Sequence, residues 1–478
     1  MAQVVPPHTS ERPRSARWAS RLAAVAAAAA IAVPPLPAHA QQRGGGVPLI
    51  RDAEIEQLLK DYTQPIFRAA GLAKANLKIV LINDKSFNAF VVDGRRIFVN
   101  TGALAESTTP NQIIGVLAHE TGHIAGGHLS KLRQELANVQ TAAVIGMLLG
   151  AAAVAAGSAV GGGAADGAGQ AGMAAIHATQ HAAQRSLLSY QRAHEEAADR
   201  AAVKFLSATG QSAKGMYETF KRFADQSMFT ARYADPYAQS HPMATERMAA
   251  LTEIARTSPH WDKKDPPELQ ARHDMMRAKL SGFMEAPQTV GRRYPMSDTS
   301  LPARYARAIA TYRHGDIRAA IAQIDALIAV QPNNPYFHEL KGQALLENGR
   351  AAEAIAPLRR AVALAPDPTL IQIMLGQALV ATNNPAHAEE AIAILRNGLA
   401  REPDTPHGYQ QLAMAYGRKG DYAQADLASA QAAFARGDIK TARELAARAK
   451  TRLPVGSPGW VRADDIVAAK VPPPPNRR

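Results

Sequence analysis

The sequence predicts an α+β protein that is mostly helical, with a small β-sheet in an N-terminal domain and a C-terminal α-solenoid. Three observations lead to this prediction. Ala dominates the apolar residues and aromatic residues make up only 5% of the chain, which favours helices over a β-sandwich. A hairpin pattern lies around Asp93-Gly94. Glycines and prolines recur at a fixed spacing after residue 300, which is typical of a helical repeat. The 478 residues suffice for two or three domains.

The first 40 residues have the pattern of an export signal. Four arginines between Arg12 and Arg21 precede the apolar run 22–33, and Ala38-His39-Ala40 fits a small-x-small cleavage site. The apolar run is shorter than the ~20 residues of a membrane-spanning helix. We therefore expect a signal peptide over 1–40 and a periplasmic protein. An uncleaved membrane anchor is the alternative.

Composition excludes several classes of function. The chain has no Cys, which excludes disulfides, Cys-ligated zinc and thiol nucleophiles, so that a metal must be held by His, Asp or Glu. The formal net charge of +13 permits contact with acidic partners or with an anionic membrane surface. The export signal, the scarcity of aromatic residues and the lack of a nucleic-acid motif argue against nucleic acid as a partner.

The N-terminal domain, expected over 41–290, begins with a mixture of helix and strand. Apolar residues recur at helical spacing over 55–66. A β-prone run follows over 77–82, and the segments 89–92 and 96–100 flank the Asp93-Gly94 turn. These segments predict a small sheet that contains a hairpin.

A helix is predicted to begin at Thr109-Pro110, a cap residue followed by Pro at the first helical position, and to carry His119-Glu120-Thr121-Gly122-His123. Two His at i and i+4 lie on one helix face and can reach one ion. A catalytic zinc site needs three protein ligands and an open position for water. Glu120 would be the general base for that water. The pattern also occurs by chance, but here apolar residues flank it.

The third ligand cannot be chosen from spacing alone. His128 lies one residue short of the third His of the HExxHxxGxxH arrangement, where this chain has Leu129, so we interpret it as second-shell or structural. The better candidate is the segment from Glu195 to Asp199. On a helix these two residues share a face, so that Glu195 could complete the metal shell while Asp199 orients a ligating His. Glu196 remains an alternative to Glu195.

The segment 136–165 contains no charged residue, and its Gly/Ala-rich continuation extends to 176. Its length allows a membrane crossing. A single crossing would, however, place the proposed ligands in different compartments. We therefore expect 141–176 to be a flexible flap or a membrane-surface segment, followed by a helix over 187–206.

The C-terminal part repeats itself. Spacings of 34 residues separate Gly315 from Gly349, Gly342 from Gly376, and Pro332 from Pro366. A third unit carries extra residues near 383–385, and a fourth follows around Tyr416 and Gly420. This period and its small residues are typical of the tetratricopeptide repeat. We expect such a domain over 300–455 and a Pro-rich tail over 456–478, of which 471–478 is expected to be disordered.

Taken together, these residues resemble the peptidase family of the HtpX, Oma-type and CAAX prenyl proteases. The resemblance rests on the HExxH residues, on Glu195-x-x-x-Asp199, on Asn88-Ala89-Phe90 and on His241-Pro242 with Arg247. Alignment on Asp199 selects Glu195 as the ligand. A signal peptide and C-terminal repeats are similar to the periplasmic BepA type within this family.

The resemblance implies a zincin-like, HExxH zinc metalloendopeptidase with one Zn²⁺ per chain. It implies quality control of unfolded or stalled outer-membrane β-barrel proteins, with the repeats contacting the barrel-assembly machinery. In BepA-type proteins the residue that matches His241 can fill the open zinc position and keep the enzyme latent; stabilisation of the oxyanion is the alternative role. Arg247 would orient the ligand carboxylates or bind substrate, a plain surface Arg being the other interpretation.

Two further expectations concern partners. An edge strand in the region 88–100 would bind an extended substrate through its backbone, with little sequence specificity. The repeats would present a concave surface to partner segments. The competing hypothesis from another class of function is a periplasmic chaperone or adaptor that acts mainly through its repeats.

Overall fold

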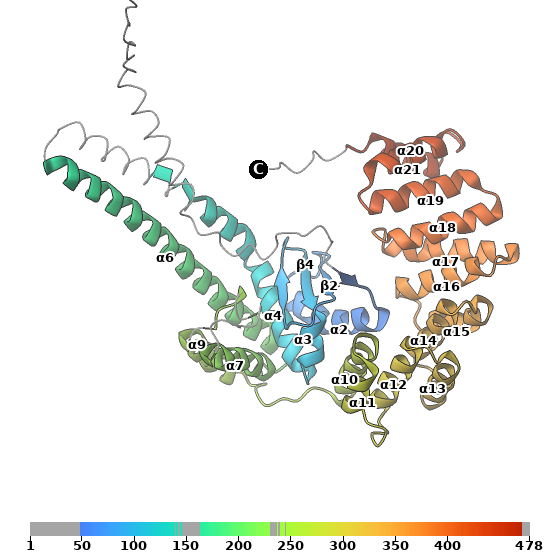
Figure 1. The fold of residues 1–478 in the computed structure, drawn as a ribbon, viewed down its shortest axis with the longest axis horizontal. Helices are drawn as coiled ribbons and strands as arrows, with labels where there is room; N and C mark the ends of the chain where they lie inside the picture. The colour runs from blue at the N-terminus through green and yellow to red at the C-terminus, as the bar shows by residue number, and fades with distance from the viewer. Residues whose placement is uncertain are drawn as a thin grey trace, which may run out of the picture. The chain divides into compact units, whose positions relative to one another are not determined.

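The computed structural model describes the chain between residues 48 and 470, with internal gaps (Figure 1). The described residues are 48–138, 140–141, 144–145, 163–229, 237, 240–243 and 245–470. The predicted signal peptide, most of 141–162 and the last eight residues, 471–478, lie outside the described residues. The description below concerns the unit that begins at Leu49.

A four-stranded mixed sheet has the order β1-β2-β4-β3. Its strands are β1 (Leu49–Ile50), β2 (Lys78–Ile82), β3 (Ala89–Val91) and β4 (Arg96–Asn100). β2 and β4 are parallel, whereas β3 and β4 form the antiparallel hairpin predicted from the sequence. Gly94 adopts a φ of 72°, which the turn requires and which Gly tolerates without strain. β3 and β1 are therefore the two edge strands.

The central helix of this domain is α4 (Pro110–Ala125), which begins where Thr109-Pro110 predicted. It packs against the sheet at β3 and against α6 (Gly163–Ala208) and α7 (Lys214–Phe229). Residues along most of its length are buried, including the polar residues His119 and Glu120. α4 is thus a core helix, as its apolar flanks indicated.

α4 and α6 approach each other closely at one Gly. A Cβ atom on Gly122 would lie 2.8 Å from the carbonyl oxygen of Ala198, which is backbone and cannot move aside. Since contact distances for such atoms are longer, only Gly allows this separation of the two helices. The same crossing places the His residues of α4 opposite Glu195 and Asp199 of α6.

α6 differs from the prediction at its N-terminal end. The helix begins at Gly163 rather than near 187, so that 163–176, expected to belong to a flexible flap, is helical. The many Ala residues of this stretch are strong helix formers and continue a helix that packing stabilises further along. Among the described residues, none of the helices combines the length and the apolar character that a membrane span requires.

The remaining helices of the N-terminal part are α2 (Ala53–Ala69), α3 (Thr101–Glu106), α9 (Thr245–Arg256), α10 (Pro267–Met284) and α11 (Pro287–Arg293). α2 matches the predicted helix, and its N-cap Asp52 accepts a hydrogen bond from the backbone N–H of Ile55. α10 packs against the first repeat helix. The buried Lys279 on α10 lies 2.8 Å from an Asp52 carboxylate oxygen and 3.2 Å from a Glu54 oxygen.

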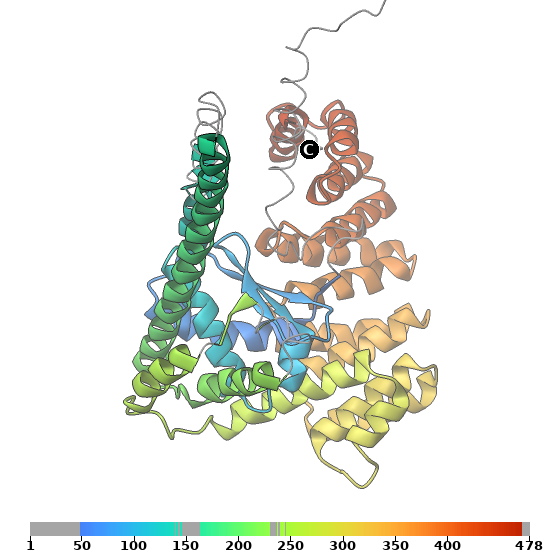
Figure 2. The ribbon, with the colours of Figure 1, turned by 60° about the vertical axis from the view of Figure 1, so that its left-hand side comes forward.

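The repeats form successive antiparallel helix pairs, seen stacked from yellow to red in Figures 1 and 2. Their helices are α12 (Leu301–Arg313), α13 (Ile317–Val330), α14 (Pro335–Glu347), α15 (Ala351–Leu364), α16 (Thr369–Ala381), α17 (Ala388–Arg401), α18 (Pro406–Lys419) and α19 (Tyr422–Ala435). The extra residues of the third unit form a 3₁₀ helix, η1 (Pro385–His387). The mostly helical α+β fold with a repeat solenoid is therefore confirmed.

The solenoid extends further than predicted. α20 (Ile439–Lys450) is followed by α21 (Pro458–Ala468), so that the segment expected to be a Pro-rich tail from 456 contains a helix, while the predicted disorder of 471–478 lies outside the described residues. Ala463 and Ile466 of α21 are buried against α19 and α20. The prolines and charges of this stretch suggested a tail, but two apolar residues suffice to cover the end of the solenoid.

The small residues of the repeats are explained by helix crossings. A Cβ atom on Gly376 would lie 2.5 Å from the Leu395 Cγ atom, and one on Gly342 would overlap the fully buried Leu358. We expect Gly342→Ala to reduce the free energy of unfolding by about 1–3 kcal/mol, because the core is overpacked.

Gly417→Ala is the matched control, since Gly417 is also helical but has open space around its Cβ position. It should stabilise the chain by up to about 1 kcal/mol through helix propensity. Thermal and urea unfolding of the full chain measure both variants. Equal stability of the two would contradict the crossing geometry.

Candidate metal centre

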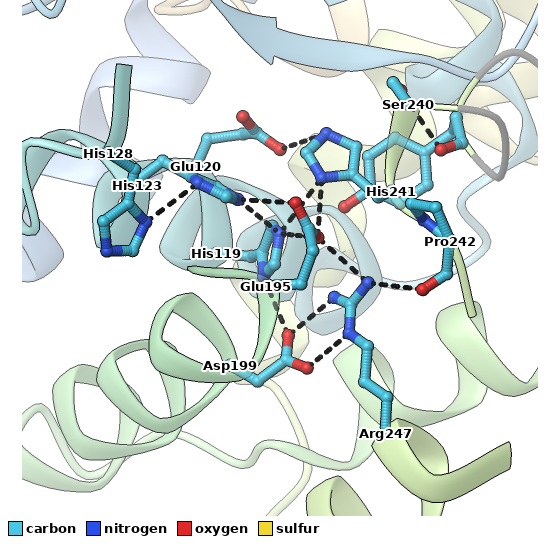
Figure 3. Close-up of polar contacts among 11 residues, drawn as sticks. His119, Glu120, His123, His128, Glu195, Asp199, Ser240, His241, Pro242 and Arg247 are labelled. Carbon is cyan, nitrogen blue, oxygen red and sulfur yellow. Dashed lines mark hydrogen bonds and ion pairs between the residues drawn. The ribbon is translucent and has the colours of Figure 1, made fainter. Parts of the chain in front are cut away.

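The structure brings four possible metal ligands together, from three separate parts of the chain. The side chains of His119, His123, Glu195 and His241 each offer one donor atom, and these atoms all lie within 4.8 Å of one another (Figure 3). The first two come from α4, Glu195 comes from α6, and His241 lies between α7 and α9. All except the half-buried His123 are buried.

The spacing of three of these donors suits a tetrahedral ion. His119 Nε2 lies 3.0 Å from His123 Nε2 and 3.4 Å from Glu195 Oε2, while His123 Nε2 lies 3.4 Å from Glu195 Oε1. Ligands bonded at ~2.1 Å in tetrahedral geometry stand ~3.4 Å apart. The donor set, two imidazoles and a carboxylate without any thiolate, suits zinc among the common catalytic metals.

The charge of the site also favours a cation. Three carboxyl groups, of Glu120, Glu195 and Asp199, are buried with the guanidinium of Arg247. With neutral imidazoles, the form in which His binds a metal, this leaves an excess of two negative charges, three against one, which a divalent ion would neutralise. Burial opposes protonation of His119, yet the neighbouring carboxylates outweigh it and raise its pKa to about 9. The residues present therefore fit a divalent metal.

Asp199 and Arg247 hold two of the donor residues in position through hydrogen bonds and ion pairs. Asp199 Oδ1 lies 2.9 Å from His119 Nδ1, which leaves Nε2 of that ring as the atom that faces the cluster. Arg247 donates from Nε to Asp199 Oδ2 at 2.7 Å, and its NH1 group lies 2.9 Å from Glu195 Oε2. The guanidinium and the imidazole keep the pKa of Asp199 below its usual range despite burial, which opposes them.

Arg247 is therefore no surface residue. It is 4% exposed, and its guanidinium stacks over the Phe220 ring at 5.2 Å. The surface interpretation of Arg247 is wrong, and the geometry is that of a residue that orients the two carboxylates. Its fork-shaped donor pattern suits this bridging position.

His128 contacts a donor from the other side. Its Nδ1 atom lies 3.1 Å from Nδ1 of His123, so that one ring donates and the other accepts. Burial and the nearby His194 and Lys131 lower the pKa of His128 to about 4, which keeps the ring neutral near pH 7. Gly126 is required here, because a Cβ atom at that position would overlap the His128 ring. His128 thus contacts a residue of the cluster but is not one of its four members.

Glu120 faces the cluster from the same helix as His119. One of its carboxylate oxygens lies 3.5 Å from Nε2 of His241, and the residue is 1% exposed. Burial raises the pKa of Glu120 above its usual range. A carboxylate tuned in this direction is a better general base near neutral pH.

The structure also separates Glu195 from Glu196. Glu195 lies in the cluster, whereas the Glu196 side chain is 41% exposed and lies 3.6 Å from Arg200. Two supporting residues were not singled out from the sequence. Phe220 packs edge-on against His119 with ring centroids 5.3 Å apart, and the buried Tyr237 ring lies 4.6 Å from His241. Both contacts join residues far apart in the sequence, so no local pattern indicated them.

Comparison with known proteins agrees with this arrangement. Residues 50–255, which contain every residue of the cluster, match the model of peptidase family M48. Residues 305–368 and 345–414 match tetratricopeptide-repeat models. The chain carries an M48 peptidase domain followed by tetratricopeptide repeats. This combination was expected from the residues, and the metallopeptidase class follows from the family.

Several curated proteins align with this chain. The beta-barrel assembly-enhancing protease of Yersinia pestis is 24% identical over 436 residues, which cover 89% of this chain and 85% of that protein. The protein of the same name from Escherichia coli K12 is 24% identical over 442 residues with the same coverage. A putative beta-barrel assembly-enhancing protease of Vibrio cholerae is 24% identical over 212 residues, or 44% of this chain.

The cluster predicts which acidic residue retains metal in the M48 domain. Glu195→Gln should lower metal content at least about tenfold, because the donor loses its charge while Asp199 and Arg247 remain. The neighbouring Glu196→Gln is the matched control and should keep the content of the unmodified chain. Metal analysis after dialysis against a mild chelator measures both. The reverse result would move the ligand to Glu196.

Proposed function

We propose that this chain is a zinc-dependent endopeptidase that acts in the periplasm. The observation that carries this proposal is the position of Glu120, buried on the same helix as two imidazole donors and facing a four-residue cluster within an M48 domain. Binding of a metal for structural purposes alone would not require a carboxylate with a raised pKa beside the donors. His119, His123 and Glu195 would hold the ion.

Each side chain has a distinct part in the proposed reaction. A bound zinc ion lowers the pKa of a water molecule and polarises the scissile carbonyl group. Glu120 accepts the proton of the attacking water and passes it to the leaving amide nitrogen. Asp199 holds His119 in the tautomer whose Nε2 faces the metal, and Arg247 fixes the positions of Asp199 and Glu195.

The general-base role makes a direct prediction. Glu120→Gln should reduce kcat for cleavage of an unfolded protein such as casein by about 10²-fold or more, since the amide cannot accept the proton. Zinc content should stay unchanged, because Glu120 is not one of the proposed ligands.

Glu246→Gln, on the exposed start of α9, is the control that should keep full activity. Activity of Glu120→Gln equal to that of the unmodified chain would refute the peptidase proposal.

His241 is proposed to hold the enzyme latent. Its Nδ1 atom lies 2.9 Å from Glu195 Oε2 and 3.4 Å from His119 Nε2, while its other nitrogen lies 3.5 Å from Glu120. A ring in this position stands between the proposed ligands and the general base, where a reacting water must be. Stabilisation of the oxyanion would instead require the ring to face the substrate carbonyl.

Latency predicts a gain of activity on mutation. His241→Ala should raise the rate of casein cleavage several-fold while zinc stays bound, because three protein ligands remain. The control His314→Ala removes an exposed imidazole from the repeats and should change nothing. A fall in activity for His241→Ala would favour the oxyanion role and count against latency.

The clients and the location are proposed from the relatives and from the sequence. Relatives that align with 89% of this chain are named beta-barrel assembly-enhancing proteases. With an export signal, this supports cleavage of unfolded or stalled outer-membrane proteins, with the repeats as the contact to the barrel-assembly machinery. Removal of the predicted signal peptide, whose four Arg and one Glu carry a net +3, would leave +10 of the +13 of the whole chain, which would favour a peripheral contact with anionic membrane surfaces.

An extended client segment would add to the edge strand β3. In the described part of the sheet β3 pairs with β4 alone, and it packs on α4, which carries the cluster. Backbone hydrogen bonds to an edge strand tolerate many sequences, which suits the cleavage of misfolded chains.

The alternative function is a chaperone or adaptor that acts mainly through its repeats. Five successive helix pairs, from α12 to α21, favour a role in partner binding. The two proposals differ in cells: if the Glu120→Gln chain supports outer-membrane assembly as well as the unmodified chain, the repeats carry the function.

A further inference from the structure

A pair of aromatic rings lies on the side of the sheet opposite the core. Phe90 of β3 and Phe98 of β4 are direct cross-strand partners, and their rings stack with centroids 5.4 Å apart and an interplanar angle of 10°. Val80 of β2 is the next partner in the same row. All three are half-buried and lie outside the hydrophobic clusters that the described residues form. We call these three residues the outer apolar row.

The row continues directly to the open edge of the sheet. Side chains alternate along a strand, so that Ala89 and Val91 of β3 face the core while Phe90 faces outward. β3 is the edge strand, and within the described residues no further strand follows it. Phe90 is therefore the last aromatic side chain before the position that an added strand would take.

The same edge lies next to the proposed reaction site. β3 packs on α4, and Figure 3 shows a strand of the sheet passing above Glu120 and His241. A peptide added to β3 would present one set of alternate side chains to the α4 side. The other set would lie beside Phe90 on the outer side, at the distance of a cross-strand pair.

We propose that the outer apolar row is a substrate subsite for apolar or aromatic side chains at every second position of an extended client. This rests on the proposed peptidase function and on strand addition at β3. The enzyme would then recognise the alternation of a segment rather than its sequence. Strands of outer-membrane barrels alternate apolar and polar residues with this period, so they are the chemical class of client that the row fits.

The row does not act through backbone contacts, which any peptide makes, but through side-chain pairing. Arg96 lies over the Phe98 ring at 5.4 Å, and its partner Asp93 holds it there at 2.6 Å. The guanidinium thus lies over Phe98, the middle member of the row, whereas Phe90 lies at the end of the row next to the open edge of the sheet. Aromatic pairs across strands contribute modestly each, so the effect should grow with the number of alternating positions.

The test compares two peptides of identical composition, one with apolar and polar residues alternating and one with the same residues in two blocks. Fluorescence anisotropy measures their affinity for the zinc-loaded full chain carrying Glu120→Gln and His241→Ala. These substitutions make the result independent of turnover and of the proposed latency. We expect the alternating peptide to bind roughly 3- to 10-fold more tightly. Equal affinities, or no binding of either peptide, would overturn the proposal.

A variant pair in the same background locates the preference. Phe90→Thr keeps a β-prone residue but removes the ring, and should abolish the preference for alternation. Leu49→Thr removes an exposed apolar side chain from the opposite edge strand and should retain it. If Phe90→Thr retains the preference for the alternating peptide, or if both variants lose it, the assignment of the subsite to the outer apolar row is overturned.

The two proposals fail separately. If neither the unmodified chain nor His241→Ala cleaves casein but the preference for alternation is found, the peptidase proposal is wrong and the subsite stands as a binding site. If casein is cleaved but both peptides bind equally, the peptidase stands and the subsite is wrong. Thermal unfolding of Phe90→Thr checks its folding, and the peptide comparison needs no change at Phe90.

Discussion

The close contact between α4 and α6 is the constraint on which the centre depends. At Gly122 the two backbones approach to a distance that excludes a Cβ atom, because the Ala198 carbonyl lies in the way. His119 lies about one turn before Gly122 on α4 and His123 directly follows it; Glu195 and Asp199 stand in the same relation to Ala198 on α6. A larger residue at position 122 would separate the helices, and the donors would no longer share one ion.

That contact creates an electrostatic problem, which the surrounding residues resolve. Buried carboxylates are costly unless they are paired. Arg247 pairs with both Asp199 and Glu195, and His119 contacts Asp199 through the nitrogen that faces away from the cluster. The negative charge that remains is directed toward the donor atoms. The ion pairs therefore offset the cost of burying these carboxylates, and the negative charge that remains favours the binding of a cation.

The sheet and the repeats connect this centre to the surfaces that are proposed to bind partners. β3 is both an edge strand and a neighbour of α4, so that one strand links the reaction site to the place where an extended chain would bind. The repeat helices pack against α10, and the buried Lys279 joins this region to the start of α2. The proposed metal centre, the edge strand β3 and the repeats are thus parts of one continuous unit from Leu49 onward.

Local patterns in the sequence determined the elements that carry the chemistry: the helix from Pro110 with its HExxH residues, the hairpin around Gly94 and the repeats with their 34-residue spacing. These are short-range features, governed by caps, turns and periodicity, and the structure reproduces them. The N-terminal extent of α6 was missed, although its Ala residues favour a helix, and α21 was missed because its Pro-flanked segment is ordered by packing that no local pattern shows. Only the tertiary structure distinguished Glu195 from Glu196 and buried Arg247 beside the carboxylates. Neighbouring residues on a helix differ in direction by about 100°, and which direction faces the donors depends on how α4 and α6 cross.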